Sequence, residues 1–332
     1  MEPAREASSE ASGDVVADFQ RAAEGLGRVR SALSGAIYGQ DAAVELALAA
    51  VVAGGWAMIV GAPGSAKTRL AEVLGQALGL DAGRVAFTPD LELDEIVEEA
   101  APRKSWDASG VRRSRPGPLF RQLLLADDLD RAAPKVRSAL LEAAHDGAVR
   151  GFDGVRPLPR PFYLLATSTQ DGVASFDETE ADRFLLRIDM AAPDRSGERR
   201  LLVETAGRAN AERIPAQIDP ELLVLAQRLA VELPVGEKVV EAILDLVRRA
   251  RPDDPSAPAI VKQAVARGPG PRAGQALMRL ARARALIDGR PSPSIADVRA
   301  LAAAVLKPRL VMARGGSADI EAVLTELLAG LS

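Results

Sequence analysis

A glycine-rich turn at residues 61–69 carries the side chains and backbone best suited to hold a phosphate group. It follows an apolar run at 56–59, which predicts a buried strand, and precedes residues 69–78, whose spacing predicts a helix. The turn consists of Gly61, Ala62, Pro63, Gly64, Ser65, Ala66, Lys67, Thr68 and Arg69. Backbone N–H groups in such a turn wrap an anion, and the positive end of the helix dipole faces it. The segment therefore predicts a P-loop that binds a nucleoside triphosphate.

Three positions of this turn have specific expectations. Lys67 would reach the β- and γ-phosphates of ATP, and the Thr68 hydroxyl would be a ligand of Mg²⁺. Ala66 stands where a P-loop usually has its second glycine. We expect this alanine to cost little, on the assumption that the backbone there is already helical.

A second candidate lies at 123–128, where an apolar strand ends in Asp127 and Asp128. An apolar strand that ends in acidic residues is the Walker B pattern of ATPases, and it follows the P-loop by about 60 residues. The first carboxylate would hold the Mg²⁺ shell together with Thr68, and the second would polarise the attacking water. The expected cofactors are ATP and Mg²⁺.

Composition excludes several other chemistries. The sequence has no cysteine, so thiol catalysis and thiolate metal sites are excluded, and its single histidine, His145, cannot build a zinc cluster or a histidine-based triad. A net charge of −4 argues against general attraction to nucleic acid. No apolar run approaches the roughly 18 residues of a membrane span, and the N-terminus does not resemble a signal peptide. We expect a soluble, cytoplasmic protein.

The elements that must position these residues alternate between strands and helices up to residue 192. Near-continuous apolar strands are expected at 56–59, 84–88, 123–126, 162–166 and 184–190. Such strands predict an α/β fold with a parallel sheet and helices on both faces. Ligands of these folds bind at the carboxyl ends of the strands, where Lys67, Asp127 and Thr169 would meet.

The chain divides into three expected parts. Residues 1–18 have no periodic apolar face and are interpreted as a disordered tail, and residues 19–192 form the nucleotide-binding α/β domain. Residues 193–332 show no convincing strand and predict a smaller all-α domain. Its helices are expected at 196–211, 220–230, 237–250, 272–288, 294–306 and 317–331. A basic insert at 102–118 is either a contact site for an acidic partner or a solvated loop.

Taken together, these motifs resemble the MoxR family of AAA+ ATPases, relatives of the magnesium-chelatase ATPase subunit. The resemblance runs from about Phe19 to the C-terminal helices. The most specific matches are Phe87-Thr88-Pro89-Asp90-Leu91, Gly117-Pro118-Leu119-Phe120, Leu125-Ala126-Asp127-Asp128-Leu129-Asp130-Arg131-Ala132, Asp182-Arg183-Phe184-Leu185-Leu186-Arg187-Ile188 and Gly270-Pro271-Arg272-Ala273. The family's fold is a P-loop AAA+ domain followed by a helical lid.

The resemblance also implies roles for residues near the nucleotide. Tyr38, Gly39 and Gln40 match the segment that lies against the adenine. Thr169 matches sensor 1, the residue that helps to place the water against the γ-phosphate.

Two arginines match residues that contact the γ-phosphate in the family. Arg183 corresponds to the arginine finger, which is donated to the nucleotide of the neighbouring subunit. Arg272 corresponds to sensor 2 and would reach the γ-phosphate across the cleft between the domains. A planar guanidinium suits the spread negative charge of a phosphoryl group in transfer. The simpler alternatives are an ion pair of Arg183 with Asp182 and a surface charge at Arg272, and Arg187 is a rival candidate for the finger.

Three residues depart from the family pattern: Asp128 and Asp130 replace the usual glutamate and asparagine, and Thr169 replaces an asparagine. Aspartate has one methylene less than glutamate, which withdraws the carboxylate by roughly 1 Å, and an error of that size costs on the order of 10² in rate. We therefore expect intact nucleotide binding and slow hydrolysis.

The resemblance implies an ATP-dependent, chaperone-like remodeller that forms a homo-oligomeric ring, expected to be a hexamer. Family members commonly act with partners that carry a von Willebrand factor A domain. The alternative is a nucleotide-gated assembly scaffold with little or no hydrolysis. A DNA-linked helicase or loader has only the basic insert in its favour, and the overall acidity argues against it.

Overall fold

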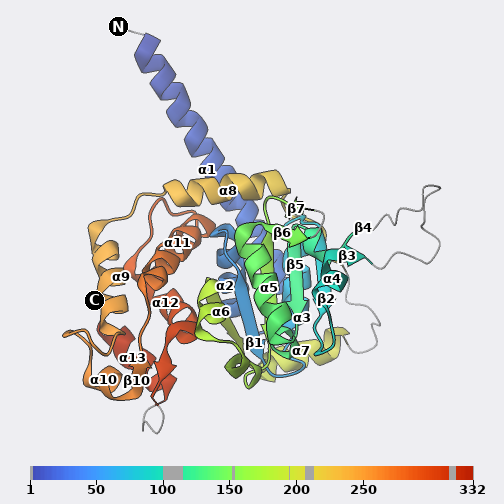
Figure 1. The fold of residues 1–332 in the computed structure, drawn as a ribbon. Helices are drawn as coiled ribbons and strands as arrows, with labels where there is room; N and C mark the ends of the chain where they lie inside the picture. The colour runs from blue at the N-terminus through green and yellow to red at the C-terminus, as the bar shows by residue number, and fades with distance from the viewer. Residues whose placement is uncertain are drawn as a thin grey trace, which may run out of the picture.

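The computed structural model describes residues 3–99, 115–151, 154–193, 195–205, 213–313 and 319–331 (Figure 1). Its central sheet has five parallel strands in the order β2-β5-β8-β1-β9. These strands are β1 (Ala57–Gly61), β2 (Ala82–Ala86), β5 (Leu123–Asp127), β8 (Tyr163–Ser168) and β9 (Leu186–Met190). The predicted parallel α/β sheet is therefore confirmed.

Apolar side chains of the three inner strands, β5, β8 and β1, alternate between two cores, one on each face of the sheet. In β1, Ala57 and Ile59 pack into one core, whereas Met58 and Val60 pack into the other. The first core lies under α1 (Pro3–Ala36), α2 (Asp41–Val52) and α3 (Lys67–Ala77), and the second lies under α5 (Pro134–Asp146). Burial on both faces explains why these strands are nearly continuous apolar runs.

Short elements complete the sheet domain. They are α4 (Leu93–Val97), β3 (Glu98–Glu99), β4 (Arg115–Pro116), η1 (Pro118–Phe120), η2 (Leu129–Arg131), β6 (Ala148–Gly151), β7 (Gly154–Pro157), η3 (Gly172–Ser175) and α6 (Glu178–Arg183). β3 pairs with β4 and β6 pairs with β7, both antiparallel. Residues 102–114, most of the basic insert, lie outside the described residues.

The C-terminal part is a helical lid. It comprises α7 (Arg195–Thr205), α8 (Pro220–Glu232), α9 (Glu237–Arg249), α10 (Ala259–Ala264), α11 (Pro271–Ile287), α12 (Ile295–Leu306), η4 (Lys307–Arg309) and α13 (Ile320–Ala329). Its buried side chains belong to the same core as those of α1, α2 and α3, so the lid packs on the sheet domain. One expectation needs correction, because β10 (Val265–Arg267) pairs with β11 (Val311–Met312) in a small antiparallel ribbon. These runs of two and three residues are too short to give a strand pattern.

The N-terminal segment also differs from expectation. Residues 1–18 are predicted to be disordered, but α1 already begins at Pro3, and its N-terminal half projects from the rest of the molecule in Figure 1. The C-terminal half of α1 buries Ala22, Leu26, Val29 and Leu33 at helical spacing. Extending an existing helix requires no new nucleation, so a helix that forms in the packed segment can continue toward Pro3.

Candidate functional site

The P-loop connects the end of β1 to the start of α3, as predicted. Gly61 leaves no room for a side chain, because a Cβ atom there would lie 2.6 Å from the Met190 carbonyl oxygen. Ala66 has φ of 66° and ψ of 23°, so it is left-handed and not helical. The assumption that alanine costs little here is therefore wrong. A left-handed conformation costs a non-glycine residue about 1–2 kcal/mol.

Lys67 lies within the P-loop, where its side chain contacts the backbone of the loop. Its side chain is buried, and its Nζ donates to the carbonyl oxygens of Gly61, at 2.8 Å, and Ala62, at 3.0 Å. Ser65 is also buried, and its Oγ has no hydrogen-bond partner within the described part of the chain. A buried ammonium and an unpartnered hydroxyl in a glycine-rich turn fit the binding of an anion.

The Asp127 carboxylate is held by three side chains. Its Oδ1 accepts from Thr68 Oγ1 at 2.8 Å and from Thr167 Oγ1 at 2.7 Å. Its Oδ2 accepts from Arg84 Nη2 at 2.7 Å. Burial alone raises the pKa of Asp127, but these hydrogen bonds and the positive charge of Arg84 outweigh it, so the pKa lies below the ordinary value of 3.8. Asp127 is therefore an ionised carboxylate near neutral pH.

Thr68 and Asp127 meet the chemical requirements of a magnesium site. Their oxygen atoms lie 2.8 Å apart, and both are hard donors of the kind that Mg²⁺ prefers. No group of three or more His, Cys, Asp or Glu side chains that could hold a metal occurs among the described residues. One hydroxyl and one carboxylate are a set that suits Mg²⁺, which takes one or two protein ligands and completes its shell with waters and phosphate oxygens.

Thr167 is a site residue that the sequence analysis did not assign. It is fully buried at the end of β8, where its hydroxyl donates to Asp127 and accepts from the backbone N–H of Asp128 at 2.8 Å. Thr167 thus fixes the end of the neighbouring strand β5, from which both predicted Walker B carboxylates extend. The polar run directly after an apolar strand was the signal that could have identified it.

Asp128 occupies an unusual backbone position. Its φ of 53° and ψ of 47° place it in the left-handed region, which aspartate tolerates better than most residues. Its side chain is 44% exposed and lies 4.0 Å from Arg131 Nη1. The carboxylate therefore stands free of the Asp127 cluster and open to solvent.

Two of the residues that depart from the family pattern contact each other. Thr169 Oγ1 donates to Asp130 Oδ2 at 3.3 Å and accepts from the Gly172 N–H at 3.0 Å. Asp130 Oδ1 is buried and has no partner among the described residues. The Thr169 hydroxyl is thus held beside a carboxylate oxygen that still has an open position for a hydrogen-bond donor.

The segment expected beside the adenine lies next to the end of β9. Gly39 has a φ of 69°, which explains the glycine at this turn. Gln40 is buried and its side-chain amide donates to the Ala191 carbonyl oxygen, while the Arg200 guanidinium lies 4.5 Å from the centre of the Tyr38 ring. Because β9 is the neighbour of β1, this segment approaches the sheet at its carboxyl edge, where the P-loop also lies. The adenine contact itself stays a prediction.

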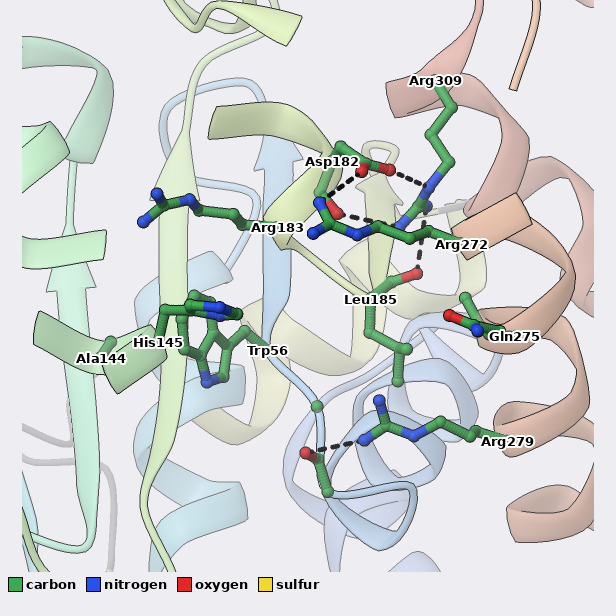
Figure 2. Close-up of a pocket in the computed structure, with 13 residues that line it drawn as sticks. Trp56, Ala144, His145, Asp182, Arg183, Leu185, Arg272, Gln275, Arg279 and Arg309 are labelled. Carbon is green, nitrogen blue, oxygen red and sulfur yellow. Dashed lines mark hydrogen bonds and ion pairs between the residues drawn. The ribbon is translucent and has the colours of Figure 1, made fainter. Parts of the chain in front are cut away.

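Arg183 and Arg272 line a different pocket, of about 380 Å³, at the amino edge of the sheet (Figure 2). We call it the arginine pocket; its lining includes Gly54, Gly55, Trp56, Asp182, Arg183, Arg272, Arg279 and Arg309. Trp56 directly precedes β1, whereas the P-loop follows β1. The five-residue strand separates these two ends by about 16 Å. Arg272 is therefore not brought to the P-loop of its own chain.

The Asp182 carboxylate lies between two arginines of the lid (Figure 2). It accepts from Arg272 Nη1 at 3.0 Å and from Arg309 Nε at 2.9 Å. Arg309 is almost completely buried and also donates to backbone carbonyls, including that of Phe184 at 2.7 Å. Its burial lowers the pKa of its guanidinium, a change that the negative charge of Asp182 opposes. Arg309 thus anchors Asp182, and Asp182 holds Arg272.

Arg183 differs from both of these arginines. In Figure 2 its side chain points away from Asp182, and its Nη1 is buried without a hydrogen-bond partner in the described part of the chain. The alternative of an Arg183–Asp182 ion pair is therefore not found. The rival candidate Arg187 is held by Asp189, at 2.6 Å, and by Gln170, at 2.8 Å, outside this pocket.

Comparisons with known proteins identify the family. The family model described as "ATPase family associated with various cellular activities (AAA)" matches residues 56–186, and the AAA lid domain matches residues 257–327. The chain is 31% identical to "Chaperone MoxR1" of Mycobacterium tuberculosis, over 85% of this chain and 74% of that protein. It is 28% identical to "Uncharacterized protein YeaC" of Bacillus subtilis, over 92% of this chain and 94% of that protein.

A solved structure extends the comparison to the fold. A crystal structure from Cytophaga hutchinsonii matches with a TM-score of 0.86 at 22% identity, over 98% of each chain. At that identity the match concerns the fold alone. Within the residues that the structure describes, no helix has the length and apolarity needed to cross a membrane.

Proposed function

The chain belongs to the MoxR family of AAA ATPases, and from this premise we propose that it binds ATP with Mg²⁺ at the P-loop and hydrolyses it in a site shared by two subunits. The observation that carries this proposal is the separation of the two charged sites. The P-loop and Asp127 lie at the carboxyl edge of the sheet, whereas Arg183 and Arg272 lie at the amino edge. A complete ATPase site then requires the carboxyl edge of the sheet in one chain and the amino edge of the sheet in another.

At the carboxyl edge each residue has a defined role in this proposal. Lys67 turns from the loop carbonyls to the β- and γ-phosphates, and Thr68 with Asp127 holds Mg²⁺. When bound, Mg²⁺ neutralises the charge that develops on the phosphate oxygens. Asp128 orients the attacking water, and Thr169 assists it.

At the amino edge the arginine pocket supplies positive charge to the nucleotide of the neighbouring chain. The buried, unpartnered Nη1 of Arg183 makes it the stronger candidate for direct contact with the γ-phosphate. Arg272 is more exposed and already bonded to Asp182, so it would assist from the same side. This replaces the sequence-based expectation that Arg272 acts within its own subunit.

A shared site implies a closed ring in which every chain both gives and receives arginines. We propose a homo-hexamer with chaperone-like remodelling activity, in line with the name of the relative "Chaperone MoxR1". A partner with a von Willebrand factor A domain remains part of this proposal from the family resemblance. The half-exposed Asp128 and the bonded Thr169 support slow hydrolysis, and a scaffold with little or no hydrolysis is the second candidate.

Phosphate release measured against protein concentration tests the shared site. If catalysis needs two chains, the activity per chain should rise with concentration and level off when ATP-dependent hexamers, followed by analytical ultracentrifugation, are fully formed. Constant activity per chain from dilute monomer to concentrated sample would contradict the proposal. ATP-dependent hexamers without phosphate release would favour the scaffold.

A further inference from the structure

Arg84 bridges the P-loop helix and the Walker B strand. It lies on β2, the edge strand, whose pairing with β5 places Ala86 opposite Asp127. Its Nη2 donates to Asp127 Oδ2 at 2.7 Å, and its Nη1 donates to Glu72 Oε1 on α3 at 3.0 Å. One guanidinium thus joins two carboxylates from different elements.

This arrangement matters because the Arg84 guanidinium is hydrogen-bonded to Asp127, the carboxylate that is proposed to bind a metal. Asp127 Oδ1 is taken by the hydroxyls of Thr68 and Thr167, and Oδ2 is taken by Arg84. A divalent cation beside Thr68 and Asp127 would lie next to this guanidinium, and like charges at such short range repel strongly in a partly buried site. The metal and Arg84 therefore compete for the same carboxylate.

Glu72 is a second anionic partner that Arg84 can keep when it leaves Asp127. The Arg84 side chain is 52% exposed and Glu72 is 35% exposed, so both can change conformation without disturbing the core. A guanidinium that leaves Asp127 can keep its ion pair with Glu72 and remain neutralised. The same pair connects this movement to α3, the helix whose first residues are Lys67 and Thr68.

We propose that Arg84 sets the metal affinity of the nucleotide site: it neutralises Asp127 when no metal is bound and shifts to Glu72 when Mg²⁺ enters. This inference rests on the proposed function, because it requires that Asp127 and Thr68 hold the metal. The opposite role is that Arg84 merely orients Asp127 for the metal. The two roles predict opposite changes in affinity when the charge is removed.

Binding of Mn²⁺ in the presence of ADP, followed by electron paramagnetic resonance, distinguishes them without relying on turnover. Arg84→Gln should bind Mn²⁺ about 5- to 10-fold more tightly than the wild type, because the competing charge is gone. Glu72→Gln should bind it about 2- to 5-fold more weakly, because Arg84 then has only Asp127 as a partner. Unchanged or weaker Mn²⁺ binding by Arg84→Gln would overturn the proposal, as would tighter binding by Glu72→Gln.

A matched control removes an arginine that lies at the opposite ends of the same two strands, β2 and β5. Arg121 precedes β5 and pairs with Asp81, which precedes β2, at 2.9 Å. Arg121→Gln should leave Mn²⁺ affinity unchanged, and a tightening equal to that of Arg84→Gln would reduce the effect to overall charge. Asp127→Asn separates the proposed metal site from the proposed role of Arg84. If Asp127→Asn binds Mn²⁺ normally, the proposed metal site is wrong. If Asp127→Asn loses Mn²⁺ but Arg84→Gln does not bind it more tightly, the metal site stands and only the role of Arg84 is contradicted.

Discussion

The two ends of the central strands differ in how the charges of their side chains are neutralised. At the carboxyl edge, Lys67 donates to two backbone carbonyls, and Asp127 is bonded to Thr68, Thr167 and Arg84. In the arginine pocket, the described lining holds four arginines and one carboxylate, and Arg183 Nη1 has no partner among the described residues. One edge is balanced within the chain, and the other has an excess of positive charge.

This difference indicates where each edge finds its ligand. A buried guanidinium nitrogen without an acceptor is costly, so a fold that keeps one gains something from it when an anion arrives. In the proposed site, the carboxyl edge binds the nucleotide of its own chain, and Lys67 and Asp127 exchange partners that they already have. At the amino edge, Arg272, Arg279 and Arg309 also have partners in the chain. In the proposed shared site, Arg183 is the arginine that meets an anion from a neighbouring chain.

The largest expected effect comes from removing Arg183, whose Nη1 has no hydrogen-bond partner among the described residues. Arg183→Ala should lower the rate of phosphate release by about 10³-fold, since an arginine that stabilises the transferred phosphoryl group contributes at least that much. Nucleotide affinity should stay within about twofold, because Arg183 is not part of its own chain's P-loop site. The measurements are steady-state phosphate release and fluorescent ATP binding.

Mixing experiments sharpen this test. Arg183→Ala mixed with Lys67→Ala should recover part of the lost activity, at interfaces that pair an intact P-loop with an intact Arg183. Arg187→Ala is the matched control, because Arg187 is bonded to Asp189 and Gln170 in its own chain. Full activity of Arg183→Ala alone would rule out Arg183 as the donated arginine, and Arg187 would then become the candidate for the finger.

The next test addresses the balanced edge. Lys67→Ala should weaken ATP binding by about 100-fold, because the variant loses a charge-assisted contact to the phosphates. Lys135→Ala, an exposed lysine on α5, is the control and should bind ATP normally. Affinity of Lys67→Ala within about twofold of the wild type would remove the P-loop assignment.

The elements of this fold were predictable because their signals are local. Apolar runs such as 123–126 are buried on both faces of the sheet, so the pattern that identifies them does not depend on their neighbours. The same holds for the helix expected at 294–306, because Ser294 is a common capping residue and accepts from the Asp297 N–H at the start of α12. The short ribbon β10–β11 has no such signal, because two or three residues show no periodicity.

The contacts within the site were less predictable because they depend on strand order and on the position of the lid. Arg84 meets Asp127 only because β2 and β5 are neighbours. Arg272 meets Asp182 only because the fold brings the start of α11 next to α6. By contrast, the left-handed backbone of Ala66 could have been expected, since a position where glycine is usual often requires a positive φ.

A smaller change is expected at Asp128. Asp128→Glu extends the carboxylate by roughly 1 Å toward the proposed water and should raise the rate of phosphate release by about tenfold. The gain is limited, because glutamate tolerates the left-handed backbone at this position less well than aspartate. ATP affinity should barely change. The measurement is phosphate release at saturating ATP, and an unchanged or lower rate would remove the physical basis for slow hydrolysis.

The smallest expected effect concerns the strained backbone of the P-loop. Ala66→Gly should relieve a left-handed conformation worth about 1–2 kcal/mol, against an entropy cost of about 0.4–1 kcal/mol for the unfolded chain. The net gain of about 0.5–1 kcal/mol predicts a rise in Tm of about 1–2 °C without nucleotide.

Ala62→Gly is the matched control for this variant, because it lies in the same loop and its φ is not positive. It should leave Tm unchanged or lower it slightly, since it increases the entropy of the unfolded chain without relieving any strain. If both variants raise Tm equally, the effect belongs to the loop in general and not to the conformation of Ala66. If Ala66→Gly raises Tm but weakens ATP binding, Ala66 keeps the P-loop organised for its ligand. Part of the affinity of the P-loop for ATP would then depend on backbone strain that the free protein carries.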